Sequence, residues 1–303
     1  MPEATLNYLM CPDATGGHRM AYWQWGDEQS SHVVVCVHGL TRQGRDFDTL
    51  AQALCRQTPV PIRVICPDVA GRGQSDWLQD PALYQMPAYA ADMLALLTHL
   101  RPATLDWVGT SMGGVIGMIL CGQPDLPLPV PIRRLVLNDV GPVMQWQALQ
   151  RIGEYLGQTG KFSSLQEAAD ALWATSSSFG PHTPAQWLAL SAPMVKPMPQ
   201  CPGYLTLRYD PAIALPFRSV TPESVAQGEA MLWQLYDNIK AATLLVRGAQ
   251  SDLLTLETAQ TMTQRGPMAR LLQFEGVGHA PTFVADDQVQ AVTSFLLDQA
   301  RGV

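Results

Sequence analysis

Short apolar runs rich in β-branched residues alternate with helical patterns along most of this chain. The first two runs, HVVVCVHG at 32–39 and IRVICPD at 62–68, flank a stretch whose apolar residues recur at helical spacing. Continuous apolar runs of this length are typical of strands that are buried on both faces of a parallel sheet. A strand, a helix and a second strand form a β-α-β unit. Further strands are expected at 104–110, 132–141, 241–248 and 269–276. The alternation therefore predicts an α/β fold with a mostly parallel, doubly wound sheet.

The texture of the sequence changes after Gly141-Pro142. From there to about residue 228 no strand-like run is as strong as the others, and SAPMVKPMPQCPG at 191–203 is dense in proline. An insertion that leaves the sheet beyond a strand's carboxyl end lies over the edge where open α/β sheets bind ligands. The expected domains are a core formed by residues 1–141 and 229–303 and a helical cap formed by residues 142–228.

Composition excludes several classes of protein. The 26 acidic residues outnumber the 19 Lys and Arg, which leaves a net charge of −7 and no basic patch for nucleic acid or an anionic membrane. The amino terminus has no basic start and no long apolar run, so we expect a cytoplasmic protein without export. The six cysteines form no CxxC pair, and no HExxH motif or Cys/His cluster is present. We expect reduced cysteines, no metal and no cofactor.

The strongest chemical signal is Gly109-Thr110-Ser111-Met112-Gly113, placed between a predicted strand and a predicted helix. A serine at such a turn adopts strained backbone geometry, and only small residues two positions to either side leave room for it. The turn lifts the serine hydroxyl above the sheet and aims the helix amino terminus at a bound oxyanion. Ser111 is therefore the predicted nucleophile.

A serine nucleophile needs a general base, which an acid in turn orients. His279 lies in Gly276-Val277-Gly278-His279-Ala280-Pro281, directly after the last predicted strand, and we predict that it is the base. Asp252 follows the strand at 241–248 and is the preferred acid. Asp139, at the end of LVLND, is the alternative acid.

The turn after the first strong strand reads His38-Gly39-Leu40-Thr41. The backbone amides of Leu40 and Met112 are the predicted oxyanion donors, whereas His38 is expected to be structural. Possible substrate-binding residues are Arg42, Trp146 and Trp187.

Taken together, these segments resemble the α/β-hydrolase superfamily, specifically its capped esterase and C–C hydrolase branch. The matching pieces are VHGLTRQGRDF, CPDVAGRGQSDW, DWVGTSMGG, LVLNDVGP, LLVRGAQSDLL and GVGHAP. They span nearly the whole core in the family's order. The resemblance implies that Ser111 is the nucleophile, that Asp252 and His279 are its partners, and that the insertion forms a cap.

Two departures bear on the substrate. C–C bond hydrolases often carry HGxGPG at the oxyanion turn and asparagine before the serine, whereas this chain has HGLTRQ and Thr110. Haloalkane dehalogenases have a carboxylate where Ser111 stands, which excludes that chemistry.

The expected activity is hydrolysis of small-molecule carboxylic esters through an acyl-enzyme. The alternatives are a C–C hydrolase or lactonase with the same triad, and a ligand-binding module without turnover. The sequence does not fix the oligomeric state.

Overall fold

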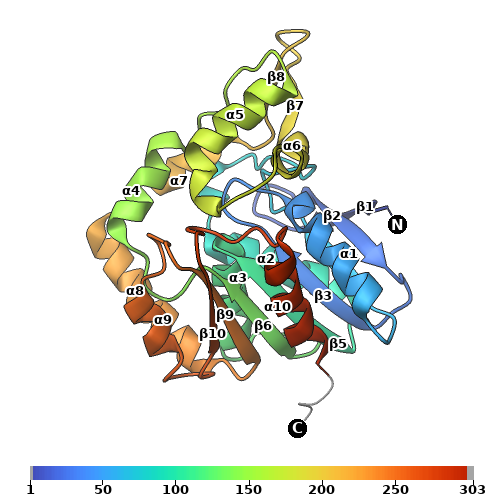
Figure 1. The fold of residues 1–303 in the computed structure, drawn as a ribbon, viewed down its shortest axis with the longest axis vertical. Helices are drawn as coiled ribbons and strands as arrows, with labels where there is room; N and C mark the ends of the chain where they lie inside the picture. Colours follow the sequence, from blue (N-terminus) through green and yellow to red (C-terminus); the bar gives the residue numbers. More distant parts are fainter. Residues whose placement is uncertain (1–2, 299–303) are drawn as a thin grey trace.

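The structure, a computed structural model, describes residues 3–298 and is built on an eight-stranded sheet (Figure 1). The strand order is β1-β2-β4-β3-β5-β6-β9-β10. β1 and β2 pair antiparallel, β2 pairs antiparallel with β4, and every other neighbouring pair is parallel. The predicted α/β fold with its mostly parallel sheet is therefore confirmed. The strands are β1 (Thr5–Cys11), β2 (His18–Gly26), β3 (His32–Val37), β4 (Arg63–Pro67), β5 (Thr104–Thr110), β6 (Ile132–Asn138), β9 (Ala242–Gly248) and β10 (Arg270–Phe274).

β3 shows why these apolar runs form central strands. Val33, Val35 and Val37 belong to the apolar cluster on one face of the sheet, and Val34 and Cys36 belong to the cluster on the other. All five are fully buried. A strand that is covered on both faces has no solvent side, which is why its sequence is a continuous apolar run.

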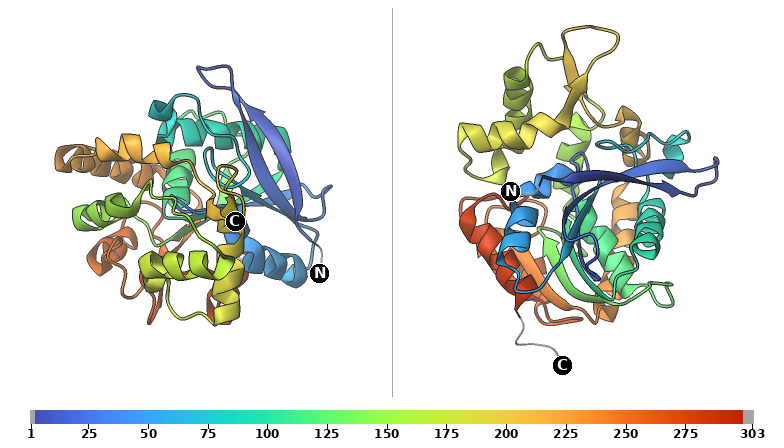
Figure 2. Two further views of the ribbon diagram at one scale, coloured as in Figure 1. Left: turned by 90° about the horizontal axis from the view of Figure 1, so that it is seen from above. Right: turned by 90° about the vertical axis from the view of Figure 1, so that its right-hand side faces the viewer.

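Helices cover both faces of the sheet (Figures 1 and 2). α1 and α10 pack together on one face, and α2, α3, α8 and α9 cover the other. Their bounds are α1 (Asp48–Gln57), α2 (Met86–Leu100), α3 (Met112–Gly122), α8 (Pro222–Asn238), α9 (Leu256–Met262) and α10 (Asp286–Leu297). This doubly wound arrangement leaves the carboxyl ends of the parallel strands free to carry a site.

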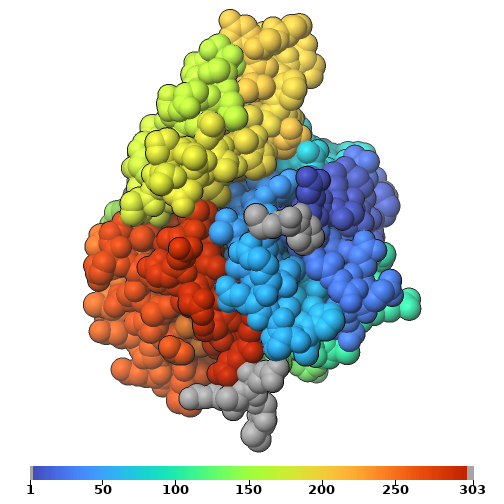
Figure 3. All heavy atoms as spheres, turned by 45° about the vertical axis from the view of Figure 1, so that its right-hand side comes forward, coloured from blue at the N-terminus to red at the C-terminus, as the bar shows by residue number. Residues whose placement is uncertain are grey.

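Between β6 and β9 the chain forms a separate lobe above the carboxyl edge of the sheet (Figures 1 and 3). We call this lobe, residues 142–218, the cap. Its elements are α4 (Trp146–Tyr155), α5 (Leu165–Ser176), α6 (Pro184–Ser191), α7 (Ala214–Arg218), and the antiparallel pair β7 (Val195–Pro197) and β8 (Leu205–Leu207). The predicted boundary at residue 228 falls inside α8, which packs on α3 of the core. The outermost residues assigned to the core, 1–2 and 299–303, lie outside the described range.

Several short 3-10 helices connect the main elements. They are η1 (Gly44–Phe47), η2 (Pro81–Leu83), η3 (Ser177–Phe179), η4 (Ala192–Met194) and η5 (Pro211–Ile213). All six cysteines are free thiols. Within residues 3–298, no helix has the length and apolar character needed to cross a membrane.

Candidate active site

Ser111 stands at a sharp turn between the end of β5 and the start of α3. Its backbone has a φ of 51°, a left-handed conformation that is unusual for a residue with a side chain. A Cβ at Gly109 would lie 2.3 Å from the carbonyl oxygen of Gly113, and one at Gly113 would lie 2.1 Å from the carbonyl oxygen of Val37. The two glycines are therefore required because strand, turn and helix pack too closely for any side chain.

His279 reaches the same point from the loop that follows β10. Its Nε2 lies 3.1 Å from the Oγ of Ser111, which is hydrogen-bonding distance. Asn138 holds the two loops together, because its Nδ2 donates to the Oγ1 of Thr110 and to the backbone oxygen of Pro281. The predicted nucleophile and base, which are far apart in the sequence, thus meet at the carboxyl edge of the sheet.

The second ring nitrogen of His279 is bound to Asp139. Nδ1 lies 2.7 Å from Oδ2 of this carboxylate, which is completely buried at the end of β6. Oδ1 of Asp139 accepts a hydrogen bond from the amide of Gly248 at 2.9 Å, and Oδ2 accepts one from the hydroxyl of Ser251 at 2.5 Å. These bonds fix the orientation of the carboxylate.

The expectation that Asp252 is the acid is wrong, because Asp139 and not Asp252 is bonded to His279. The side chain of Asp252 is half exposed and forms an ion pair with Arg151 of α4. β6 and β9 are neighbours in the sheet, so the loops after both strands reach the same edge. Asp139 has a φ of 55° and lies against His279, whereas the β9 loop contributes Ser251, the residue before Asp252, as a hydrogen-bond donor.

The amides of Leu40 and Met112 lie on either side of the serine turn. Met112 is the first residue of α3, so its N–H has no partner within the helix. A Cβ at Gly39 would lie 3.7 Å from the Cβ of Ser111, which places the Leu40 turn directly beside the serine. Neither amide takes part in the turn, loop or cap hydrogen bonds of residues 3–298. Both donors are therefore available to an oxyanion.

His38 and Arg72 hold the backbone of the Gly39-Leu40 turn by hydrogen bonds. His38 is completely buried; its Nδ1 is bonded to the carbonyl oxygen of Gly39, and its Nε2 accepts from the amide of Val69. Burial lowers the pKa of His38 to about 3, which keeps the ring neutral. It is structural, as expected.

Arg72 was not singled out from the sequence. It is completely buried, and its Nε donates to the carbonyl oxygen of Leu40 at 2.8 Å. Its Nη1 donates to Tyr89, and its Nη2 lies 3.6 Å from the sulfur of Met112. Arg72 thereby contacts both residues whose amides are the predicted oxyanion donors. The sequence feature that could have drawn attention to Arg72 is its position in Gly71-Arg72-Gly73, shortly after the buried strand β4.

A cavity of about 310 Å³ opens between this edge of the sheet and the cap. Ser111, His279 and Leu40 lie on its floor. Its remaining walls come largely from α4, α5 and the segments around them, through Arg151, Ile152, Tyr155, Phe162, Leu172, Thr175, Phe179, Met194, Leu207 and Tyr209. Its size suits a small ligand, and the cap would separate that ligand from bulk water.

The predicted substrate-binding residues are distributed unevenly around this cavity. Arg42 lines it, but its Nε and Nη2 both donate to Asp46 at 2.6 and 2.7 Å. Trp187 lies inside the cap core, where its indole N–H donates to the backbone of Ala169. Trp146 packs against a small cluster that contains Leu149 and Leu253. Neither tryptophan is among the residues that line the cavity, which corrects the expectation that they bind substrate.

Comparison with known proteins places the chain in a family. Residues 34–292 match the model of the alpha/beta hydrolase family. The chain belongs to this family. It is also 48% identical over 291 residues to a protein of Cupriavidus necator named 3-hydroxybutyrate-oligomer hydrolase, covering 96% of this chain and 97% of that protein.

Solved structures agree with this assignment. An alpha/beta hydrolase from Novosphingobium aromaticivorans is 33% identical, with a TM-score of 0.82 over 98% of this chain and 99% of that one. A hydrolase from Rickettsia typhi, described as putative, is 27% identical, with a TM-score of 0.83 over 97% and 99% of the two chains. The protein is thus an α/β hydrolase in sequence and in fold.

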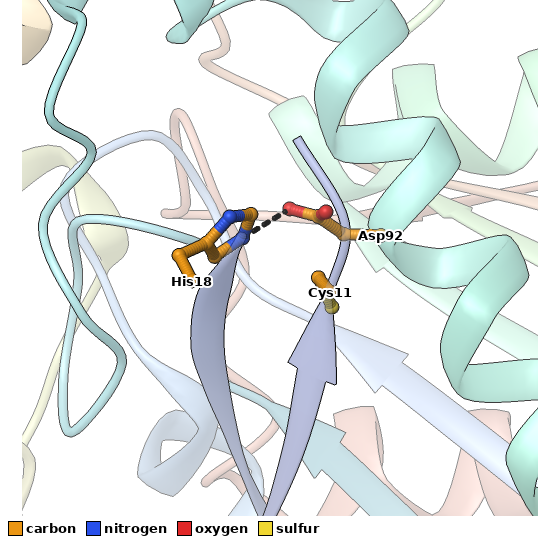
Figure 4. Close-up of side chains that lie close together, drawn as sticks. All are labelled: Cys11, His18 and Asp92. Carbon is orange, nitrogen blue, oxygen red and sulfur yellow. Dashed lines mark hydrogen bonds and ion pairs between the residues drawn. The ribbon is translucent and has the colours of Figure 1, made fainter. Parts of the chain in front are cut away.

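This hydrolase has a second buried polar cluster, formed by Cys11, His18 and Asp92 (Figure 4). Their possible ligand atoms lie within 4.8 Å of one another, and all three residue types can bind metals. Both ring nitrogens of His18 are already bonded to carboxylates: Nδ1 to Asp13 at 2.9 Å and Nε2 to Asp92 at 3.1 Å. This pairing matches an imidazolium held between two carboxylates, which ties the β1-β2 hairpin to α2.

The free energy of unfolding should therefore depend on the protonation of His18. Burial opposes the charged ring, but Asp92 and Asp13 outweigh it and raise the pKa of His18 to about 9. In the unfolded chain the pKa of histidine is about 6.5. The stabilisation that the charged His18 ring gives the folded state is complete below pH 6.5. It is lost as the pH rises through 9, and this loss lowers the free energy of unfolding by up to about 3 kcal/mol.

Urea denaturation of the wild type and of His18→Gln, at pH 7 and pH 10, measures this effect. The difference between the two proteins should shrink at pH 10, because the wild-type ring is then neutral. His99→Gln is the control, since His99 is an exposed histidine of α2. Parallel pH profiles for the wild type and His18→Gln would show that His18 is uncharged at pH 7.

Proposed function

We propose that this α/β hydrolase cleaves carboxylic esters through an acyl-enzyme formed on Ser111. The observation that carries the proposal is the continuous chain of contacts from the Oγ of Ser111 to Nε2 of His279 at 3.1 Å, and from Nδ1 of His279 to Asp139 at 2.7 Å. A serine, a base and a buried carboxylate in this order form the arrangement that activates a hydroxyl for attack on an acyl carbon.

Each group has a defined task in this reaction. His279 takes the proton of the Ser111 hydroxyl while the serine oxygen bonds to the ester carbonyl carbon. The resulting oxyanion accepts hydrogen bonds from the amides of Leu40 and Met112. The C–O bond then breaks, and His279 gives its proton to the leaving alcohol.

Deacylation repeats these steps with water as the nucleophile. His279 removes a proton from water, the hydroxyl adds to the acyl carbon, and Ser111 leaves with the proton from His279. Asp139 holds the ring with its proton on Nδ1 and stabilises the charged imidazolium during both halves of the reaction.

Short oligomers of 3-hydroxybutyrate are the proposed substrate class. The Cupriavidus necator protein named for hydrolysis of such oligomers shares 48% of its residues with this chain over nearly the whole length of both. These oligomers are joined by ester bonds, which is the bond that the serine arrangement is suited to cleave. The cavity of about 310 Å³ favours a short chain over a polymer.

A substrate panel tests this proposal. Release of acid should be measured for the dimer and trimer of 3-hydroxybutyrate, p-nitrophenyl acetate and butyrate, a lactone, and a ring-cleavage dienoate. We expect kcat/KM for the dimer or trimer to exceed that for the lactone and the dienoate by about 100-fold or more, a difference of roughly 3 kcal/mol in transition-state binding. Faster cleavage of the dienoate would instead assign the site to C–C bond hydrolysis.

A further inference from the structure

Among the described lining residues of the cavity, the arginine side chains are basic and none is acidic. The described residues that line it include two arginines, Arg42 and Arg151, and none of them is an aspartate or a glutamate. The carboxylates that pair with these arginines, Asp46 and Asp252, are not among the lining residues. A ligand in this cavity therefore meets guanidinium groups and hydroxyls but no opposing carboxylate.

The two arginines differ in how completely their N–H groups are already hydrogen-bonded within the protein. Arg42 is 8% exposed and forms a two-bond fork with Asp46 from Nε and Nη2. Its Nη2 also lies 3.4 Å from the backbone oxygen of Leu190. Arg42 is thus fixed between the core and α6, and its two-pronged edge is not free for a second carboxylate.

Arg151 is held more loosely, at the edge of the same cavity. Its side chain is 39% exposed, and its partner Asp252 is 51% exposed. Nε and Nη2 of Arg151 approach a single oxygen, Oδ2 of Asp252, at 2.9 and 2.7 Å. A guanidinium has five N–H groups, so further donors remain. Tyr155, one helical turn along α4, also lines the cavity.

We propose that Arg151 binds a free carboxylate of the substrate, so that the enzyme selects anionic hydroxy-acid esters over neutral esters of the same length. This inference rests on the proposed ester hydrolase function. The supporting observations are the position of Arg151 on the wall of the cavity that contains Ser111, its spare donors, and the absence of an acid from the described lining residues.

The chemistry of such substrates gives the carboxylate a defined place. In a linear ester of hydroxy acids, the free carboxylate belongs to the unit whose hydroxyl oxygen leaves when the last ester bond is cleaved. Ser111 attacks the carbonyl of the preceding unit, the bond from that carbon to the oxygen breaks, and His279 protonates the oxygen. Binding of the carboxylate at Arg151 therefore directs cleavage to the ester bond at the carboxyl end, and the released product is a single hydroxy acid.

The test compares the 3-hydroxybutyrate dimer with its methyl ester, which has the same scissile bond and no charge. kcat/KM is measured for both substrates with the wild type, Arg151→Gln, Arg151→Lys and Arg265→Gln. Arg265 is the matched control, because it forms a similar half-exposed ion pair, with Asp237, and does not line the cavity. Circular dichroism verifies that each variant is folded.

We expect the wild type to prefer the acid over the methyl ester by about tenfold or more, the range of one charged hydrogen-bonded pair. Arg151→Gln should remove most of this preference, mainly through a higher KM for the acid. Arg151→Lys should retain part of it, and Arg265→Gln should retain all of it. A ratio in Arg151→Gln equal to that of the wild type would overturn the inference, while ester hydrolysis itself would stand. Failure of the wild type to cleave either compound would instead refute the proposed function.

Discussion

Replacing Asp139 with asparagine is expected to lower kcat for ester hydrolysis by about 10⁴-fold, while Asp252→Asn lowers kcat for p-nitrophenyl acetate by less than about threefold. The carboxylate of Asp139 accepts the N–H at Nδ1 of His279 and stabilises the imidazolium that forms when Ser111 loses its proton. An asparagine amide can donate to Nδ1, which favours the tautomer with its proton on Nε2. The ring is then unable to accept the serine proton.

The side chain of Asp139 is completely buried, so the folded state of the variant must be verified before its activity is interpreted. Asparagine has nearly the same size, and its carbonyl oxygen can still accept the hydrogen bond from the amide of Gly248. Thermal unfolding of both variants provides this control. If Asp252→Asn loses the larger share of kcat while both proteins remain folded, the assignment of the acid is wrong.

Ser111→Ala is expected to reduce kcat by about 10⁵-fold or more, because the variant lacks the hydroxyl that His279 activates. The hydroxyl lies on the floor of the cavity and packs against little, so the variant should fold normally. Initial rates with p-nitrophenyl acetate measure the loss. More than about 1% of wild-type kcat in the purified variant would contradict the role of Ser111.

A double variant makes this test independent of the absolute rate. When residues act as one catalytic unit, removing a second member costs little after the first has gone. Ser111→Ala combined with Asp139→Asn should therefore be no slower than Ser111→Ala by more than about threefold. If the fold-decrease in kcat of the double variant equalled the product of the two single decreases, Ser111 and Asp139 would act independently.

The central strands could be predicted from the sequence because each is buried on both faces. β3 is a continuous apolar run for this reason, and in β5 Leu105, Trp107 and Val108 are likewise fully buried, although Asp106 interrupts the apolar run. β1 was not predicted. It lies at the edge of the sheet with Tyr8 and Met10 exposed, and its short apolar run YLMC carries no β-branched residues of the kind that mark the central strands.

The placement of Ser111 and His279 followed from local signals, whereas that of the acid did not. The serine lies in a turn whose strand and helix are adjacent in the sequence, so its flanking glycines form a short pattern, even though Gly113 also packs against Val37 of β3. The choice between Asp139 and Asp252 depends on which of two neighbouring loops points its carboxylate at His279. That choice is made by the positive φ of Asp139 and by the hydroxyl of Ser251, which no spacing along the chain reveals.

The cap residues of the cavity could not be predicted, because they depend on how helices pack rather than on residue type. Trp187 was a reasonable candidate for a pocket, yet it lies among Ala169, Leu172 and Leu190 in the core of the cap. Arg151 belongs to the predicted cap, but that it lines the cavity beside the buried Ile152 depends on how α4 packs.

Covalent labelling with diisopropyl fluorophosphate tests the central claim most directly. The reagent phosphorylates a serine that a neighbouring base activates, and intact-protein mass spectrometry followed by peptide mapping identifies the modified residue. We predict one adduct on Ser111 in the wild type, much slower labelling of Asp139→Asn, and none of Ser111→Ala. An adduct on another residue, or equal labelling of the wild type and Ser111→Ala, would contradict the assignment of Ser111, His279 and Asp139 as the catalytic unit.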